Sequence, residues 1–175
     1  MKTLLNNNRE VSDGCVPYFI AEVNTSHFGD IRKAKKLIDA VKKAGADCVK
    51  FQSWSTDSLY SNDFYKDNPM AKRFVKKFAL DEDEQEILAE YCKSVNIDFA
   101  STPYSIDEAN FLINKCNVPF IKVASMDINN YPYLRYLAKT ESAIIISSGM
   151  ASFGEITKAI KLLESEGASN IILLH

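Results

Sequence analysis

Apolar and polar positions along this chain alternate between short strand-like runs and longer segments with helical spacing. The first apolar run, Tyr18–Glu22, ends in a carboxylate. In residues 30–45 the apolar side chains recur three and four positions apart, which is typical of a helix buried on one face. Gly45 suits the end of that helix, and residues 48–51 form a second apolar run. The pattern therefore begins as strand, helix, strand.

The same alternation continues to the end of the sequence. It predicts further strands at residues 97–100, 120–125, 143–146 and 171–175, with helices beginning near Asp81, Ser105, Asn130 and Ser152. Three of these helix starts have a glutamate three residues on, the spacing of a capping box. Residues 53–80 are rich in aromatic side chains, which favours an ordered connection with a short helix opening at Pro69. Residues 1–17 are predicted to be an irregular lead-in.

Strict strand–helix alternation with short links predicts an α/β fold with a parallel sheet. A dinucleotide-binding sheet would need G-x-G-x-x-G after the first strand, and that turn has only Gly29. Polar residues at or just beyond the carboxyl ends of six strands favour a (β/α)8 TIM barrel instead. Such a barrel needs about 250 residues, so we expect only its first six strands here, with residues 18–175 as the N-terminal part of the barrel domain.

Two lysines lie within predicted buried strands. Lys122 alternates with Ile121 and Val123 and so faces the other side of its strand, and Lys50 shares a face with Gln52. A buried lysine is costly unless it meets an opposite charge. The pattern predicts a bound anion, either phosphate or carboxylate. The alternatives are that the lysines are structural, or that Glu22 is the buried ion-pair partner of one of them.

Composition narrows the class of protein. The sequence has a formal net charge of −2 and a pI near 5.7, without the basic face of a nucleic-acid-binding protein. It has no apolar run as long as a membrane span and no signal-peptide pattern at its start. The widely spaced Cys48 and Cys92 sit in apolar patterns, which indicates core thiols in a reducing compartment. We therefore expect a cytoplasmic protein that binds neither nucleic acid nor membranes.

Motifs along nearly the whole chain resemble the N-acetylneuraminate (sialic acid) synthase family, which includes legionaminate, pseudaminate and spore-coat polysaccharide synthases. They occur in the family's order. The matching segments are Ile20–Glu22 with His27 and Gly29, Ala44–Gln52, Ser101–Pro103, Ile121–Ser125, Asn130–Pro132 with Leu134, Ser147–Met150 and Leu173–His175.

The resemblance implies an enzyme that condenses phosphoenolpyruvate with a 2-acetamido aldose, such as N-acetylmannosamine, to give a nine-carbon 2-keto acid and phosphate. It implies that Glu22 is the acid/base carboxylate beside the sugar. His27, in the turn after the first strand, is either a residue of that turn or a substrate contact. The resemblance also implies a divalent metal, manganese or magnesium, that holds the sugar aldehyde. The residues implied to hold phosphoenolpyruvate are Lys50, Gln52, Thr102, Lys122, Ser125 and Ser147.

The sequence departs from the family pattern in several places. The family's G-x-N-H-N-G turn reads Asn24-Thr-Ser-His-Phe-Gly29 here. The metal-binding histidines of later strands and the C-terminal antifreeze-like domain are absent, so we expect the metal ligands beyond residue 175 and this segment alone to be inactive. The resemblance implies a homodimer at full length. His175 is expected to have no role.

Two other functions are compatible with the sequence. One is a related phosphoenolpyruvate-dependent ulosonate-phosphate synthase, which would need additional basic residues on the sugar side, and the turn from Val23 to Asp30 has none. The other is a non-catalytic fragment that retains the anion site without metal ligands.

Overall fold

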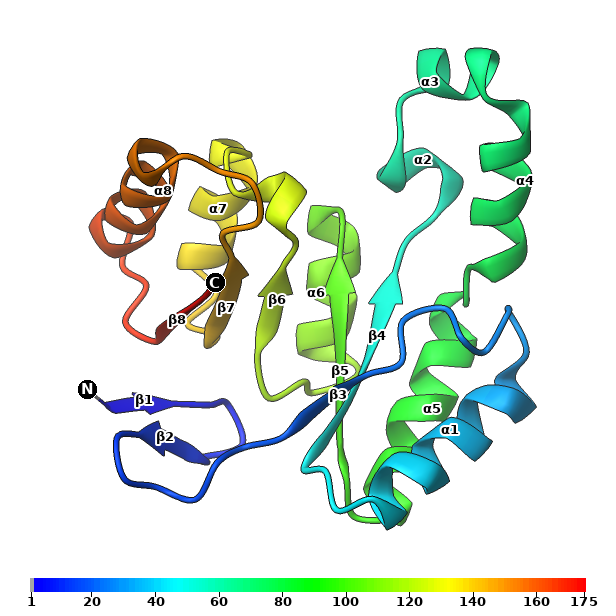
Figure 1. The fold of residues 1–175 in the computed structure, drawn as a ribbon, viewed down its shortest axis with the longest axis horizontal. Helices are drawn as coiled ribbons and strands as arrows, with labels where there is room; N and C mark the ends of the chain where they lie inside the picture. Colours follow the sequence, from blue (N-terminus) through cyan, green and yellow to red (C-terminus); the bar gives the residue numbers. More distant parts are fainter. Residues whose placement is uncertain (1) are drawn as a thin grey trace. The chain divides into compact units, whose positions relative to one another are not determined.

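The computed structural model describes residues 2–175 and divides the chain into two compact units (Figure 1). Unit 2 is the continuous segment Tyr18–Asn117. Unit 1 combines the described residues up to Pro17 with Val118–His175. Among the helices described, none is long and apolar enough to span a bilayer.

Unit 2 is built on a parallel sheet in the order β3 (Ile20–Glu22), β4 (Cys48–Ser53), β5 (Asp98–Pro103). Its main helices are α1 (Ile31–Lys43), α5 (Glu82–Ser94) and α6 (Ile106–Asn114). The buried rings of Phe51 and Phe99 stack with centroids 5.6 Å apart. The buried apolar side chains of the helices include Ala34 and Ile38 of α1 and Leu88 and Cys92 of α5, at the helical spacing seen in the sequence.

The connection between β4 and α5 is ordered, as its aromatic content predicted. It contains α2 (Thr56–Leu59), α3 (Asn62–Asp67) and α4 (Pro69–Phe78), which form the arm visible beside β4 in Figure 1. Pro69 stands in the first turn of α4, where its missing N–H costs nothing. The arm is attached through Trp54, whose indole Nε1 donates a hydrogen bond of 3.2 Å to the Val75 carbonyl.

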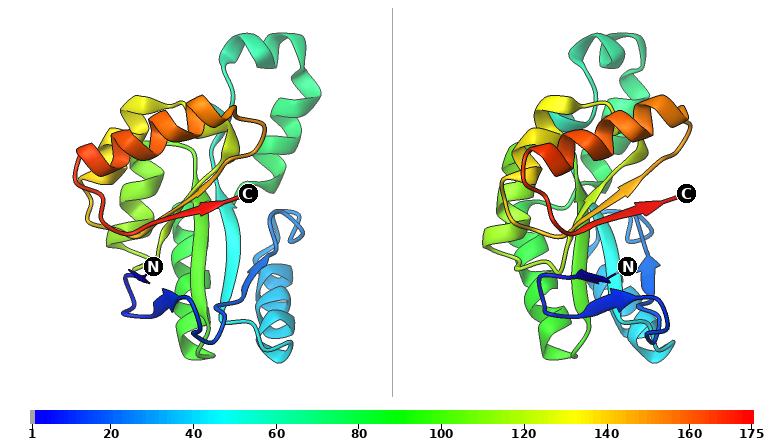
Figure 2. Two further views of the ribbon diagram at one scale, coloured as in Figure 1. Left: turned by 60° about the vertical axis from the view of Figure 1, so that its left-hand side comes forward. Right: turned by 90° about the vertical axis from the view of Figure 1, so that its left-hand side faces the viewer.

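Unit 1 contains a second parallel sheet, in the order β6 (Ile121–Val123), β7 (Ile144–Ser147), β8 (Ile171–Leu174). A 3-10 turn, η1 (Ser125–Asp127), follows β6 and leads into α7 (Tyr131–Ala138), and α8 (Phe153–Ser165) joins β7 to β8. Helices α7 and α8 pack side by side (Figure 2). The core side chains of this unit are fully buried and include Leu134, Leu137, Ile144, Ile146 and Leu163.

The N-terminal segment is not irregular, so that prediction is wrong. β1 (Lys2–Leu4) and β2 (Glu10–Ser12) form an antiparallel hairpin. The Asn6 amide joins its turn to the rest of unit 1: Nδ2 donates to the Val118 carbonyl at 3.0 Å, and Oδ1 accepts from the Ala143 N–H at 2.8 Å. These partners lie more than a hundred residues away, so local sequence gave no sign of them.

The α/β class with parallel sheets is confirmed, and each of the six predicted strands is present as β3 to β8. The closed barrel stays a prediction. Cys48 and Cys92 are buried, as expected of core thiols. Burial raises the pKa of Cys92 to about 12, so this thiol is not a nucleophile at neutral pH.

Candidate functional site

Lys50 lies at the centre of a polar cluster at the carboxyl end of the unit 2 sheet, here called the Lys50 cluster (Glu22, Lys50 and Thr102). In the strand register Glu22 is opposite Lys50, and Lys50 is opposite Ala100. Thr102 stands two residues beyond Ala100 and therefore on the same face of the sheet. Lys50 Nζ donates a hydrogen bond of 2.8 Å to Thr102 Oγ1 and forms an ion pair with the Glu22 carboxylate.

The ion pair explains how Lys50 can be buried. The Lys50 side chain is 8% exposed, whereas the Glu22 side chain is 46% exposed. The carboxylate thus neutralises a shielded ammonium and keeps contact with solvent, which reduces the cost of burying the charge. In this structure Glu22 is therefore the ion-pair partner of a lysine, which is one of the alternatives that the sequence left open. An acid/base role for Glu22 stays a prediction.

The other two predicted site residues of unit 2 are Gln52 and His27, and only Gln52 lies on the same side of the sheet as Lys50. Gln52 is half-buried, on the same face of β4 as Lys50. His27 is 1% exposed and packs on the Phe51 ring with centroids 5.8 Å apart. Phe51 alternates with Lys50 along β4, so it belongs to the opposite face of the strand. His27 is therefore packed on the face away from the Lys50 cluster.

His27 is held as a neutral imidazole. Its Nδ1 accepts a hydrogen bond of 3.0 Å from the Gly29 N–H, which leaves the proton on Nε2. Nε2 is buried and has no hydrogen-bond partner among the described residues. Burial lowers the pKa of His27, because a charged ring would be poorly solvated there.

Unit 1 contains a similar arrangement, here called the Lys122 cluster (Lys122 and Ser147). Lys122 is 8% exposed. Its Nζ donates hydrogen bonds of 2.7 Å to Ser147 Oγ and 2.6 Å to the Val123 carbonyl. Ser147 stands two residues beyond Ile145, the register partner of Lys122. Ser125 is exposed at the start of η1, close to the backbone of Gly149.

The two lysine clusters belong to different units. The structure brings together Glu22, Lys50 and Thr102 in one, and Lys122 and Ser147 in the other. The hypothesis that both clusters bind one anion stays a prediction.

Three further groups near these clusters were not predicted. His175 Nδ1 lies 2.8 Å from the buried Ser148 Oγ, so this histidine is bonded rather than incidental. Asp127 accepts a hydrogen bond of 3.2 Å from Asn130 Nδ2, and burial raises the pKa of the Asp127 carboxyl. A carboxyl group with a raised pKa is suited to proton transfer.

The third group is a buried network on the helix-covered face of the unit 2 sheet. Ser53 Oγ lies 2.6 Å from Ser101 Oγ and donates to Gln85 Oε1. Gln85 Nε2 donates to the Leu80 carbonyl at 3.0 Å. The network therefore ties the ends of β4 and β5 to the start of α5. This network was difficult to predict from the sequence, because serines at strand ends are common in turns.

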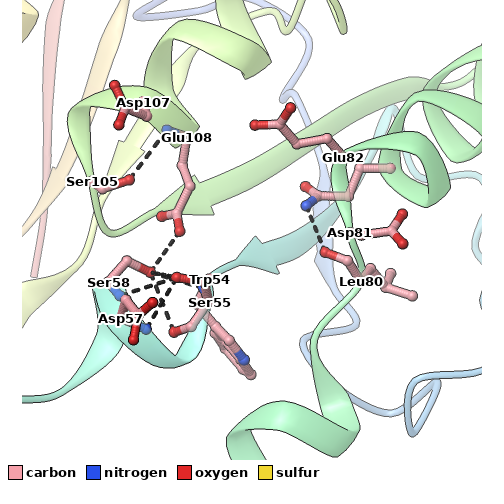
Figure 3. Close-up of a pocket in the computed structure, with 11 residues that line it drawn as sticks. Trp54, Ser55, Asp57, Ser58, Leu80, Asp81, Glu82, Ser105, Asp107 and Glu108 are labelled. Carbon is pink, nitrogen blue, oxygen red and sulfur yellow. Dashed lines mark hydrogen bonds between the residues drawn. The ribbon is translucent and has the colours of Figure 1, made fainter. Parts of the chain in front are cut away.

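A cavity of about 480 Å³ lies on unit 2 between the β4–α2 connection and the first turns of α5 and α6 (Figure 3). Two of its carboxylates have structural partners, and Asp81 caps α5 by accepting a hydrogen bond of 2.8 Å from the Glu84 N–H. Glu108 accepts hydrogen bonds from Ser58 Oγ at 2.6 Å and from the Tyr104 N–H at 2.8 Å, so it does not complete the capping box predicted with Ser105. No predicted site residue lines the cavity. The lining residues are Trp54, Ser55, Asp57, Ser58, Leu80, Asp81, Glu82, Gln85, Ser105, Asp107 and Glu108.

Within residues 2–175, no group of three or more histidine, cysteine, aspartate or glutamate side chains is arranged to hold a metal ion. The described residues therefore do not fit a complete metal site.

Comparisons with known proteins point to one protein family. The NeuB family model matches residues 37–175. The chain is 40% identical to an uncharacterised protein of Methanocaldococcus jannaschii over 177 residues, covering 100% of this chain and 50% of the relative. It is 38% identical to the N,N'-diacetyllegionaminic acid synthase of Campylobacter jejuni, covering 89% of this chain and 50% of that protein. The chain thus spans about half the length of these curated relatives.

The fold also matches a solved structure. The N-acetylneuraminic acid (sialic acid) synthetase of Leptospira borgpetersenii, crystallised with citrate, superposes with a TM-score of 0.89 at 29% identity. The match covers 100% of this chain and 59% of that protein.

Proposed function

Because this chain belongs to the NeuB family, we propose that it takes part in a condensation of phosphoenolpyruvate with a 2-acetamido aldose. The products would be a sialic-acid-type nine-carbon 2-keto acid and phosphate. The observation that carries the proposal is the pair of buried lysines. Each ends near the carboxyl edge of a parallel sheet and donates a hydrogen bond to a hydroxyl on the next strand.

Phosphoenolpyruvate carries a phosphate and a carboxylate, and these groups match the chemistry of the two clusters. An ammonium and a hydroxyl side by side can both donate to an anionic oxygen. The residues that we propose to bind phosphoenolpyruvate are Lys50, Gln52, Thr102, Lys122, Ser125 and Ser147. Fixed positive charges would also stabilise the oxyanionic intermediate formed when water adds to C2.

Glu22 is the proposed acid/base residue. In this structure it neutralises Lys50, and a bound anion would compete with it for the ammonium. Displacement would free a carboxylate that is already half-exposed and could exchange a proton with a sugar. His27 is retained as a proposed substrate contact, although its ring packs on Phe51.

The proposal includes a (β/α)8 barrel as the architecture of the whole domain. Its support is the parallel order of both sheets and the position of both lysine clusters at strand carboxyl ends. A divalent metal, manganese or magnesium, and a homodimer of the longer protein are also part of the proposal. The residues that the structure describes do not by themselves form a metal site.

The test is a calorimetric titration of the full chain with phosphoenolpyruvate. We expect measurable binding, weakened about tenfold or more in Lys122→Ala because a hydrogen bond to a charged group is lost. Lys161→Ala, which removes an exposed lysine of α8, is the matched control and should bind like the parent. A folded parent that does not bind, or equal affinity in Lys122→Ala, would contradict the proposal.

A further inference from the structure

Gly149 occupies a tight turn directly after the Lys122 cluster. Its φ is +53°, and the Ala151 N–H donates to the Ser148 carbonyl at 3.0 Å, which closes the turn. Residues with a Cβ rarely adopt this backbone conformation, whereas glycine does so at little cost.

The backbone of Gly149 also lies against Ser125. A Cβ added at Gly149 would lie 2.3 Å from Ser125 Cβ and 2.9 Å from Ser125 Oγ. Carbon atoms in contact normally stay about 3.5–4.0 Å apart. Gly14, Gly45 and Gly167 also have positive φ, yet a Cβ at each would meet nothing within 4 Å. At Gly149 the conformation and the close approach both require glycine.

The residues just before Gly149 are held by separate contacts. Ser147 Oγ accepts from Lys122 Nζ at 2.7 Å. The Ser148 N–H donates to the Leu174 carbonyl at 3.0 Å, and Ser148 Oγ lies 2.8 Å from His175 Nδ1. The end of β7 is therefore fixed, and Ser125 is the neighbour that must move if Gly149 gains a side chain.

We propose that Gly149 is a positioning residue for the anion site: its missing side chain lets the Ser125 side chain lie against the turn that directly follows Ser147, the hydrogen-bond partner of Lys122. The inference rests on the proposed function, in which Ser125 and Lys122 hold phosphoenolpyruvate. A methyl group at position 149 would push η1 away from β7 and remove the Ser125 hydroxyl from the anion. Gly149 is exposed, so this displacement need not disturb the core of unit 1.

The test compares four variants of the full chain by calorimetry with phosphoenolpyruvate: Ser125→Ala, Gly149→Ala, the double variant, and Gly154→Ala. We expect Ser125→Ala and Gly149→Ala each to weaken binding about tenfold, the scale of one hydrogen bond to a charged group. The double variant should bind no more weakly than the weaker single variant, because both changes remove the same contact. If Gly149→Ala only destabilised the loop, the affinity losses of the two single variants would multiply in the double variant.

Gly154→Ala is the matched control. Gly154 lies in the first turn of α8, and a Cβ there meets only Ser152 Oγ at 4.0 Å. Its affinity should equal that of the parent. Unchanged affinity in Gly149→Ala, or multiplied losses in the double variant, would overturn the inference.

If Gly149→Ala does not fold, the variant to measure is Gly149→Ala combined with Ser125→Gly, which lacks the atom met at 2.3 Å. Recovered folding with weakened binding supports the inference, and failure to fold overturns it. The Lys122→Ala variant distinguishes a failure of the Gly149 inference from a failure of the proposed function. If it weakens binding and Gly149→Ala does not, only this inference fails. If the parent does not bind, the proposed function fails with it.

Discussion

Lys50 and Thr102 are joined by a hydrogen bond of 2.8 Å that crosses from β4 to a residue two positions beyond the register partner of Lys50. Lys122 reaches Ser147 by the same offset, from β6 to β7, over 2.7 Å. The offset follows from the length of the lysine side chain, which carries its ammonium toward the carboxyl end of the neighbouring strand. Each sheet therefore presents an ammonium and a hydroxyl together.

Lys50→Met should abolish one of these pairs at little cost to folding. We expect phosphoenolpyruvate affinity to fall about tenfold or more, because a charged donor is lost. The free energy of unfolding should change by no more than about 1 kcal/mol, because Glu22 is half-exposed and water can solvate it. Calorimetry and urea unfolding measure the two effects. Lys36→Met, on the exposed face of α1, is the control, and equal affinity in the two variants would remove Lys50 from the site.

Gln85→Leu should destabilise the chain. The substitution removes the donor to the Leu80 carbonyl and the acceptor for Ser53 Oγ, both of which are buried. We expect a loss of about 1–3 kcal/mol in the free energy of unfolding, measured in urea. Glu90→Leu, at an exposed position of the same helix, should change it by less than about 0.5 kcal/mol. Similar losses in both would mean that the network contributes nothing.

Gly29→Ala and Gly45→Ala should differ in cost although both glycines have positive φ, +70° and +84°. A Cβ at Gly29 would lie 2.1 Å from the Lys77 carbonyl oxygen, whereas a Cβ at Gly45 meets nothing within 4 Å. Gly45→Ala should therefore cost only the conformational penalty, about 1–2 kcal/mol. Gly29→Ala should cost more, because the loop must also separate from α4. Equal midpoints in urea unfolding would show that the Lys77 contact is unimportant.

The stability of the chain should fall as the pH falls below about 7, in part because of His27. Burial lowers its pKa in the folded chain below the ordinary value of 6.5, so the unfolded chain binds the proton first. Uptake of one such proton changes the free energy of unfolding by at most about 1.4 kcal/mol per pH unit. Urea unfolding at pH 7.5 and 5.5 measures the loss, which should be smaller in His27→Phe. An identical loss in that variant would exclude His27 as the source.

The sequence predicted those features that depend on local periodicity. Strands β3 to β8 were expected because each apolar run is bounded by a helical segment, and Lys50 and Lys122 were identified because they interrupt such runs. The contacts that were not predicted join residues far apart in the sequence. Asn6 bonds to residues near 118 and 143, and Ser148 bonds to His175. His27 was a candidate substrate contact from its motif alone, and only the fold shows its ring against Phe51.

The N-terminal hairpin has a consequence for the order in which the chain folds during synthesis. Unit 2 is continuous in sequence and has its own sheet and helices, so it can fold once residue 117 has left the ribosome. The hairpin cannot complete unit 1 then, because Leu4 N–H bonds to Asn170 Oδ1 at 3.0 Å and Asn6 N–H to the Pro119 carbonyl at 2.7 Å. The hairpin is thus made before unit 2 and fixed after it. During that interval Leu5, which is buried once unit 1 has folded, stays accessible to chaperones and proteases.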